Sequence, residues 1–355
     1  MLFQEYVIIL HVDLVKKMMM KKILNVFTIF LFVIQAYGSV DIETANKGEQ
    51  QMIQALRSCI QSEKQLAIKN IIIGAGHSGC EAFKMPSSSD YRILLIWQWL
   101  DALKDISNDI IIVVPKHAVD EKFDFIKNRG QKIITIDGVL HGKTIDFIRA
   151  YESPAKIISA QTKFIIMLAG DTEQSDGRWV KYDRAMVNSL MNQLPQNQEM
   201  LFLNGPRTGK YLEKSDEVDP TAHRATTDYI TQFVMDQNKP LWKIEDFQFG
   251  VPSLWDAALK FCFDNKGVGL ILPGESTSMI SEALSLGIKP IIYEHDAMTS
   301  TSKIFVKDLY QSQRAFAISE INREDPSQVI TDYSQTPLAD QILCIKSALI
   351  DELKK

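Results

Sequence analysis

Residues 267–294, GVGLILPGESTSMISEALSLGIKPIIYE, constrain the fold more than any other part of the chain. An apolar run at 269–272 is typical of a buried parallel strand, and Pro273 and Gly274 end it. Hydroxyl side chains at 276–278 then precede a helix with periodic apolar residues, which Gly287 ends. A second apolar run at 291–293 makes the unit a strand, a crossover helix and a parallel strand. The chain must therefore contain a parallel sheet covered by helices.

The same alternation of apolar runs with polar or helical stretches continues through the chain. After a helix over 43–65, strands are expected at 71–73, 93–96, 110–114 and 132–136. A second series has strands at 164–168, 200–203 and 242–249, and helices at 182–194, 225–234 and 254–264. This predicts the α/β class, with two doubly wound Rossmann-like domains that face each other across a cleft.

The chain has 355 residues, of which 46% are hydrophobic, and this is enough to fill two cores. A break that contains Ser153 and Pro154 separates the two series of strands. We therefore expect an N-terminal domain at 39–155, a C-terminal domain of nucleotide-binding type at 156–335, and a helix within 336–355.

The first 38 residues have the pattern of a secretory signal peptide. Lysines at 16, 17, 21 and 22 precede an apolar core at 23–34 and a small-residue cleavage site at 36–38. This predicts export to the periplasm or the exterior, or, if the segment is not cleaved, anchoring in a membrane. The methionines at 18–20 offer a second start, in which case residues 1–17 are not translated.

Charge and motif content exclude several functions. The formal net charge is -5, and it becomes more negative without the basic signal segment, so nucleic acid is not an expected partner. The four cysteines form no CxxC pair, and no HExxH, Walker loop or DxD-like motif is present, so neither a metal nor a cofactor is expected. Peripheral association with a membrane and the oligomeric state are left open.

The start of the helix after 269–272 is the main candidate binding site. A helix N-terminus with free N–H groups and nearby hydroxyls binds anions, and a carboxylate one turn further in can accept hydrogen bonds from ribose hydroxyls. The alternative is a capped helix that binds nothing, since such caps are common. The candidate diphosphate- or nucleotide-binding residues in this segment are Gly274, Glu275, Ser276, Thr277, Ser278 and Glu282.

Other strand-to-loop junctions supply further candidates. Gly170 and Asp171 follow one strand, and Asn204, Arg207 and Thr208 follow the next. Arg207 could pair with a diphosphate through its planar guanidinium, or be an ordinary surface arginine.

Two histidines are candidate general bases. His77 lies in GAGHSG, which fits the dinucleotide pattern GxGxxG only weakly, so we expect a bare loop with His77 pointing into the cleft. His117 lies in VVPKHAVD, and the alternative is that it only holds its own loop in place.

Taken in order, these loops resemble the plant mitochondrial-fission family named for its elongated-mitochondria phenotype, together with its bacterial relatives. The resemblance covers about residues 45–320. It rests on the helix start KGEQQ, the loops IIIGAGHSG, VVPKHAVD and KIITIDGVLHGKT, and above all LPGESTSMISEALSLGIKP. Departures are Ala118 in place of an acid, Glu275 in place of an aspartate, AGD in place of a double glycine, and NGPRTG in place of Ser-Arg-Arg-Thr-Pro.

That family is similar in its C-terminal half to GT-B glycosyltransferases, whose Ser-Glu helix receives the diphosphate and ribose of a nucleotide-sugar. Ser281, Glu282 and Gly287 fall in register with that helix, and Pro290 lies one residue late. The resemblance also implies that the C-terminal helix, around residues 339–353, returns to the first domain.

Two functions follow from this resemblance. The first is a metal-independent GT-B-type glycosyltransferase that takes a nucleotide-sugar or other phosphate ligand as substrate, with His77 or His117 as base. The alternative is a non-catalytic binding or scaffold protein of the same fold, the role that the plant relatives imply.

Overall fold

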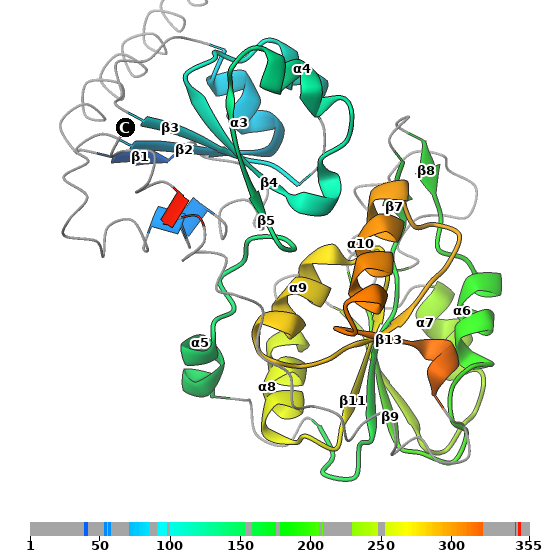
Figure 1. The fold of residues 1–355 in the computed structure, drawn as a ribbon. Helices are drawn as coiled ribbons and strands as arrows, with labels where there is room; N and C mark the ends of the chain where they lie inside the picture. Colours follow the sequence, from blue (N-terminus) through cyan, green and yellow to red (C-terminus); the bar gives the residue numbers. More distant parts are fainter. Residues whose placement is uncertain are drawn as a thin grey trace, which may run out of the picture.

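The computed structural model describes residues 39–41, 53–54, 56–57, 71–84, 91–97, 100–152, 158–174, 178–205, 208, 229–247, 253–321, 345 and 347–348. These residues form an α/β structure with two main parallel sheets, as the sequence predicts (Figure 1). The expected signal peptide at 1–38 lies outside the described residues. No helix within the described ranges is long and apolar enough to span a membrane.

The first sheet has five parallel strands that follow one another in sequence order. The strands are β1 (Ser39–Asp41), β2 (Ile71–Ala75), β3 (Tyr91–Leu95), β4 (Ile110–Pro115) and β5 (Lys132–Ile136). Because each step from β2 to β5 moves in the same direction, right-handed connections place the intervening helices on one face. The strand order never reverses here, so the expectation of a doubly wound first sheet is wrong for the described strands.

Both faces of the first sheet are packed. On one face, Cys80 and Phe83 at α3 (Gly76–Ala82) share a core with Phe123 and Ile126 of α4 (Phe123–Asn128). On the other face, the helical residues Ile53, Leu56 and Ile345 pack against the side chains of β2 to β5. The chain therefore comes back to the first sheet near its C-terminus. Short 3-10 turns, η1 (Asp101–Lys104) and η2 (Lys116–Ala118), follow β3 and β4.

The second sheet has six parallel strands in the order β10-β9-β6-β11-β12-β13. The chain enters in the middle at β6, moves outward on one side to β9 and β10, and then crosses to the other side at β11. The strands are β6 (Phe164–Met167), β9 (Met200–Leu203), β10 (Trp242–Glu245), β11 (Gly269–Pro273), β12 (Ile291–Tyr293) and β13 (Phe316–Ala317). This reversal between β6 and β11 is typical of a doubly wound sheet.

Helices cover both faces of the second sheet (Figure 1). One face carries α6 (Arg184–Met191) and α7 (Tyr229–Met235), and the other carries α8 (Trp255–Asp264), α9 (Thr277–Ser285) and α10 (Ser300–Gln311). A short antiparallel pair, β7 (Thr172–Glu173) and β8 (Trp179–Val180), follows β6. Ile148 of α5 (Ile145–Ala150) also belongs to the core of this sheet. Ile148 lies before residue 155, where the sequence analysis places the boundary between the two domains. That boundary stays a prediction.

Residues 76–79 of the GAGHSG segment are helical, and its first two residues end β2. The bare loop expected there is wrong, because α3 begins at Gly76 directly after β2. Gly76 has a φ of 56°, which lets the chain turn sharply from the strand into the helix. A Cβ at Gly79 would lie 2.7 Å from Leu94 Cδ1 and 2.9 Å from the backbone carbon of Gly74. The glycine therefore allows close packing of α3 on β2.

We predict that Gly79→Ala destabilises the protein by about 1–3 kcal/mol, because the new methyl group must push α3 away from the backbone of β2. Urea denaturation of both proteins measures the difference. Gly267→Ala is the matched control, since a Cβ there meets nothing within 4 Å. Equal stability of the Gly79 variant and the parent would contradict the close-packing explanation.

Candidate functional site

Two loops meet at the carboxyl edge of the second sheet, where its strand order reverses. Gly170 follows β6 and Glu275 follows β11, and these strands are neighbours. The backbone N–H of Gly170 donates a hydrogen bond to Glu275 Oε1 at 3.1 Å. Two residues predicted for the diphosphate site, more than 100 positions apart in sequence, are thus brought into direct contact.

The second carboxylate oxygen of Glu275 contacts a histidine that the sequence analysis did not select. His295 Nε2 lies 2.6 Å from Glu275 Oε2, and both side chains are only 3% exposed. His295 follows β12, as Glu275 follows β11. Its position two residues after a buried strand was the available signal, but its pairing with Glu275 depends on the order of strands in the sheet.

Aromatic side chains enclose this buried pair. The rings of Tyr182 and Tyr293 lie 5.2 and 5.8 Å from the ring of His295, centroid to centroid. Burial raises the pKa of both phenols, and Tyr293 donates its hydroxyl hydrogen to the carbonyl of Met167 at 3.0 Å. Glu275 is therefore held by specific partners in weakly polar surroundings, where charge interactions are strong.

The N-terminus of α9 follows Glu275 directly. Its N-cap, Ser276, makes no side-chain capping hydrogen bond, whereas Thr144, Asp183 and Thr299 cap α5, α6 and α10 in that way. Ser276 and Thr277 are partly buried, and Ser278 is exposed. The helix start thus retains hydroxyl groups that capping does not use.

Gly274 lies under α10. A Cβ at this position would meet the end of the Met298 side chain at 2.5 Å and Val306 Cγ2 at 3.4 Å. The loop from β11 into α9 is therefore packed closely beneath the segment that leads into α10.

Glu282 lies further along α9 and faces α8. Its carboxylate accepts a hydrogen bond from Trp255 Nε1 at the start of α8. Burial raises the pKa of Glu282 from 4.5 to about 7, and Asp256 adds to this rise, while the Trp255 hydrogen bond and Lys143 oppose it. Lys143 is itself 2.6 Å from Asp256. Within the described residues, no interaction joins Glu282 to the Gly170–Glu275 contact.

The loop after β5 is attached to α9 by serines. The N–H of Val139 donates to Ser281 Oγ at 2.9 Å, and Ser281 Oγ donates to the Thr277 carbonyl at 2.7 Å. One turn later, Ser285 Oγ donates to the carbonyl of Lys143 at 3.1 Å. Ser281 is fully buried, and its hydrogen bond with Val139 links the loop after the first sheet to a helix of the second.

The remaining candidates on this edge have structural partners. Asp171 is buried and accepts a hydrogen bond from the N–H of Tyr182 at 2.7 Å. Asn204 turns toward β10 and α7, where it bonds Asp246, Phe247 and Thr231. Thr208 Oγ1 accepts from the N–H of Gly205 at 3.1 Å. Arg207 lies outside the described residues.

The structure describes the side chain of only one of the two candidate bases, His117. The backbone of His77 lies in α3, and its side chain lies outside the description. His117, in η2, stacks on Phe305 of α10 with ring centroids 4.4 Å apart. Burial lowers the pKa of His117 to about 4, with Asp137 acting in the opposite direction, so the ring is neutral at pH 7.

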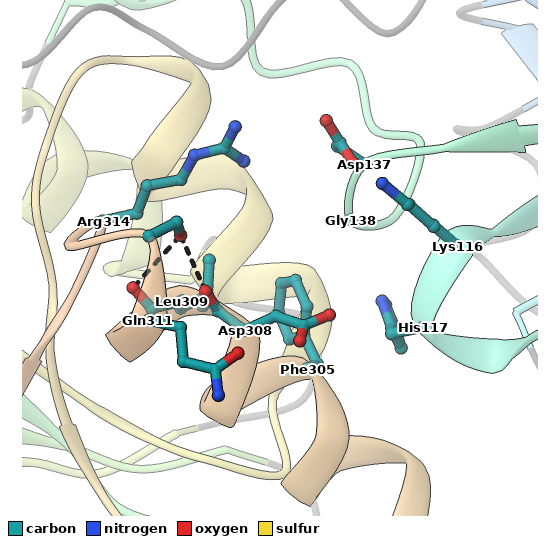
Figure 2. Close-up of a pocket in the computed structure, with 10 residues that line it drawn as sticks. Lys116, His117, Asp137, Gly138, Phe305, Asp308, Leu309, Gln311 and Arg314 are labelled. Atoms are coloured by element: carbon teal, nitrogen blue, oxygen red, sulfur yellow. Dashed lines mark hydrogen bonds between the residues drawn. The ribbon is translucent and has the colours of Figure 1, made fainter.

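His117 also lines a pocket of about 580 Å³ (Figure 2). Residues of η2 and residues just after β5 form one side, and residues at and beyond the C-terminal half of α10 form the other. Among the described residues, no group of three or more His, Cys, Asp or Glu side chains is arranged to hold a metal ion. The cysteines that are described, Cys80 and Cys262, are buried and unpaired, and burial raises the pKa of each thiol to about 12.

Comparisons with known proteins do not identify a family for this chain. No family model matches the chain, and no curated protein matches it. Among solved structures, it is similar to one described as "Crystal Structure Analysis of the Glycotransferase of kitacinnamycin", at 10% identity and a TM-score of 0.40, over 86% of this chain and 82% of that one. A TM-score this low supports no argument about function, so the resemblance to the fission family stays a prediction.

We predict that Glu282→Gln stabilises the protein at high pH but not at low pH. Below pH 4.5 the carboxyl is protonated in both folded and unfolded chains, so it contributes nothing. Between pH 4.5 and 7 the Glu282 carboxyl is ionised in the unfolded chain but still protonated in the folded one, so the free energy of unfolding falls as the pH rises. Above pH 7 this loss is complete. The gain in unfolding free energy should therefore be about 2 kcal/mol larger at pH 8 than at pH 5.

Urea denaturation at the two pH values tests this. Glu245→Gln is the matched control, because it makes the same substitution at an exposed position on β10. If Glu282→Gln increased the free energy of unfolding equally at pH 5 and pH 8, the pKa of the Glu282 carboxyl would not be raised in the folded protein.

Proposed function

We propose that the protein binds a diphosphate-bearing ligand at the carboxyl edge of the second sheet, and that it is a GT-B-type glycosyltransferase using a nucleotide-sugar. In this arrangement the two α/β units face each other across the bound ligand. The observation that carries the proposal is the contact between Gly170 and Glu275 at the reversal of strand order. In open α/β sheets, ligands bind outside the carboxyl ends of the strands at such a reversal.

The physical chemistry of this edge favours an anion. The first N–H groups of α9 and its partial positive charge point toward the β11–α9 loop, and the hydroxyls of Ser276 and Thr277 are beside them. The Gly170 N–H already bonds a negative group, the Glu275 carboxylate. A bound phosphate oxygen would take the place of that carboxylate oxygen, and His295 would retain its bond to the other one.

The rest of the ligand would extend from this point. Glu282, whose pKa is near 7, would accept a hydrogen bond from ribose with the carboxylate oxygen that Trp255 does not use. His117 would face the acceptor from the first sheet. Because its pKa is only about 4, it is a weak base in the free protein, and efficient proton removal requires that the bound anion raise this value.

One observation favours the alternative, a non-catalytic binding or scaffold protein of the fission-family type. The Glu275 carboxylate is fully engaged by Gly170 and His295, so the protein supplies its own anion where a phosphate would bind. A scaffold needs no vacant ligand site. Export through the expected signal peptide would also keep the protein away from cytosolic nucleotide-sugars, and a lipid-linked or other phosphate ligand would then replace them.

A thermal-shift titration of the full chain with UDP, GDP, ADP and their sugars tests the proposal. A ligand that binds only the folded state raises the melting temperature by mass action. We expect one diphosphate to give a saturable rise, which Glu282→Ala abolishes. Glu275→Gln should tighten binding about tenfold, because it removes a negative charge beside the phosphate and keeps an acceptor for Gly170.

Glu245→Gln again serves as the control, since it removes one negative charge from an exposed strand position and should leave binding unchanged. If no diphosphate shifts the melting temperature of either the parent or Glu275→Gln, the transferase proposal fails and the scaffold alternative is favoured.

A further inference from the structure

The pocket beside His117 is chemically distinct from the proposed diphosphate site. It lies between η2 and the end of β5 on one side and the C-terminal part of α10 on the other (Figure 2). Its volume of about 580 Å³ is within the range of small-molecule sites, about 300–1,000 Å³. None of its lining residues takes part in the Gly170–Glu275–His295 cluster.

The charges that line this pocket balance. Lys116 and Arg314 are cationic, and Asp137 and Asp308 are anionic. In Figure 2 the carboxylate of Asp137 is drawn between the ends of Lys116 and Arg314, so the two signs alternate around the opening. A simple anion would therefore meet two carboxylates, and a simple cation would meet a lysine and an arginine.

Several of these polar groups are available to a ligand. Within the part of the chain that the structure describes, the side chains of Lys116, Asp308 and Arg314 form no ion pair or side-chain hydrogen bond. The lysine and arginine only donate, the aspartate only accepts, and Gln311 does both. A ligand whose groups each donate and accept would satisfy all of them.

The base of the pocket is aromatic. Phe305 is 5% exposed and packs against the His117 ring, and Leu309 lies one turn further along α10. The neutral His117 ring can donate from one nitrogen and accept at the other. It thus combines an apolar face with two polar edges.

We propose that this pocket binds a neutral polyhydroxylated ligand, a saccharide, between the alternating charged groups of Lys116, Asp308 and Arg314 and the His117–Phe305 pair. Sugar hydroxyls both donate and accept hydrogen bonds, and the C–H faces of a sugar pack on aromatic rings. The assignment stands on the pocket alone and holds whether or not the second sheet binds a diphosphate.

Saturation-transfer NMR on the full chain tests the assignment with glucose, galactose, mannose and N-acetylglucosamine as separate probes. Inorganic phosphate, observed by ³¹P line broadening, and glycine represent the anionic and zwitterionic classes. We expect at least one sugar to bind saturably. Asp308→Asn and Arg314→Gln should each weaken that sugar about tenfold, because each loses a hydrogen bond from a charged group.

Lys307→Gln is the matched control, because Lys307 is exposed on α10 next to Asp308 and does not line the pocket. Its sugar affinity should equal that of the parent. Thermal unfolding of all three variants, each changed at a surface or partly exposed position, checks that they are folded.

Three outcomes would overturn the proposal. In the first, none of the four sugars binds saturably. In the second, a sugar binds but both pocket variants bind it as well as the parent. In the third, phosphate or glycine binds in place of sugar, and the pocket variants abolish that binding. Because no nucleotide is present, a failure here leaves the diphosphate proposal to its own thermal-shift test.

Discussion

The contact between the Glu275 carboxylate, the Gly170 N–H and the His295 ring ties the carboxyl edge of the second sheet together. It joins the loops after β6, β11 and β12 through one side chain that is almost inaccessible to water. A buried carboxylate needs its partners, because removing one partner of a buried ion pair lowers the free energy of unfolding by about 3–5 kcal/mol. Ser276, the N-cap of α9, comes directly after Glu275, so this contact helps to position the start of the helix.

The connection between the sheets depends in turn on where α9 lies. Ser281 and Ser285 on this helix hold Val139 and Lys143, which belong to the loop that leaves the first sheet. Glu282 lies between these serines and faces Trp255, beside the Lys143–Asp256 ion pair. A change at Glu275 would therefore be transmitted through α9 to the loop between the sheets, and a change in the charge of Glu282 would act on the same loop.

The sequence predicted the strands well and their partners poorly. The strands at 132–136, 200–203 and 291–293 match the structure residue for residue. The last two are uninterrupted buried apolar runs, which is typical of central parallel strands. The helix that begins at Gly76 was missed because glycines are typical of a loop, whereas here Gly79 allows the helix to pack closely on β2. Contacts such as Glu275 with His295, or Glu282 with Trp255, depend on strand order and helix rotation, which local patterns do not contain.

We propose that the Gly170 N–H marks an anion site that Glu275 fills in the free protein. Its most direct test is an NMR titration of the backbone amide of Gly170 with UDP. We expect the chemical shift of this amide to change and saturate with the ligand, because its hydrogen-bond acceptor changes from a carboxylate to a phosphate oxygen. If UDP binds and other amides shift while that of Gly170 does not move, the ligand site lies elsewhere and the claim is wrong.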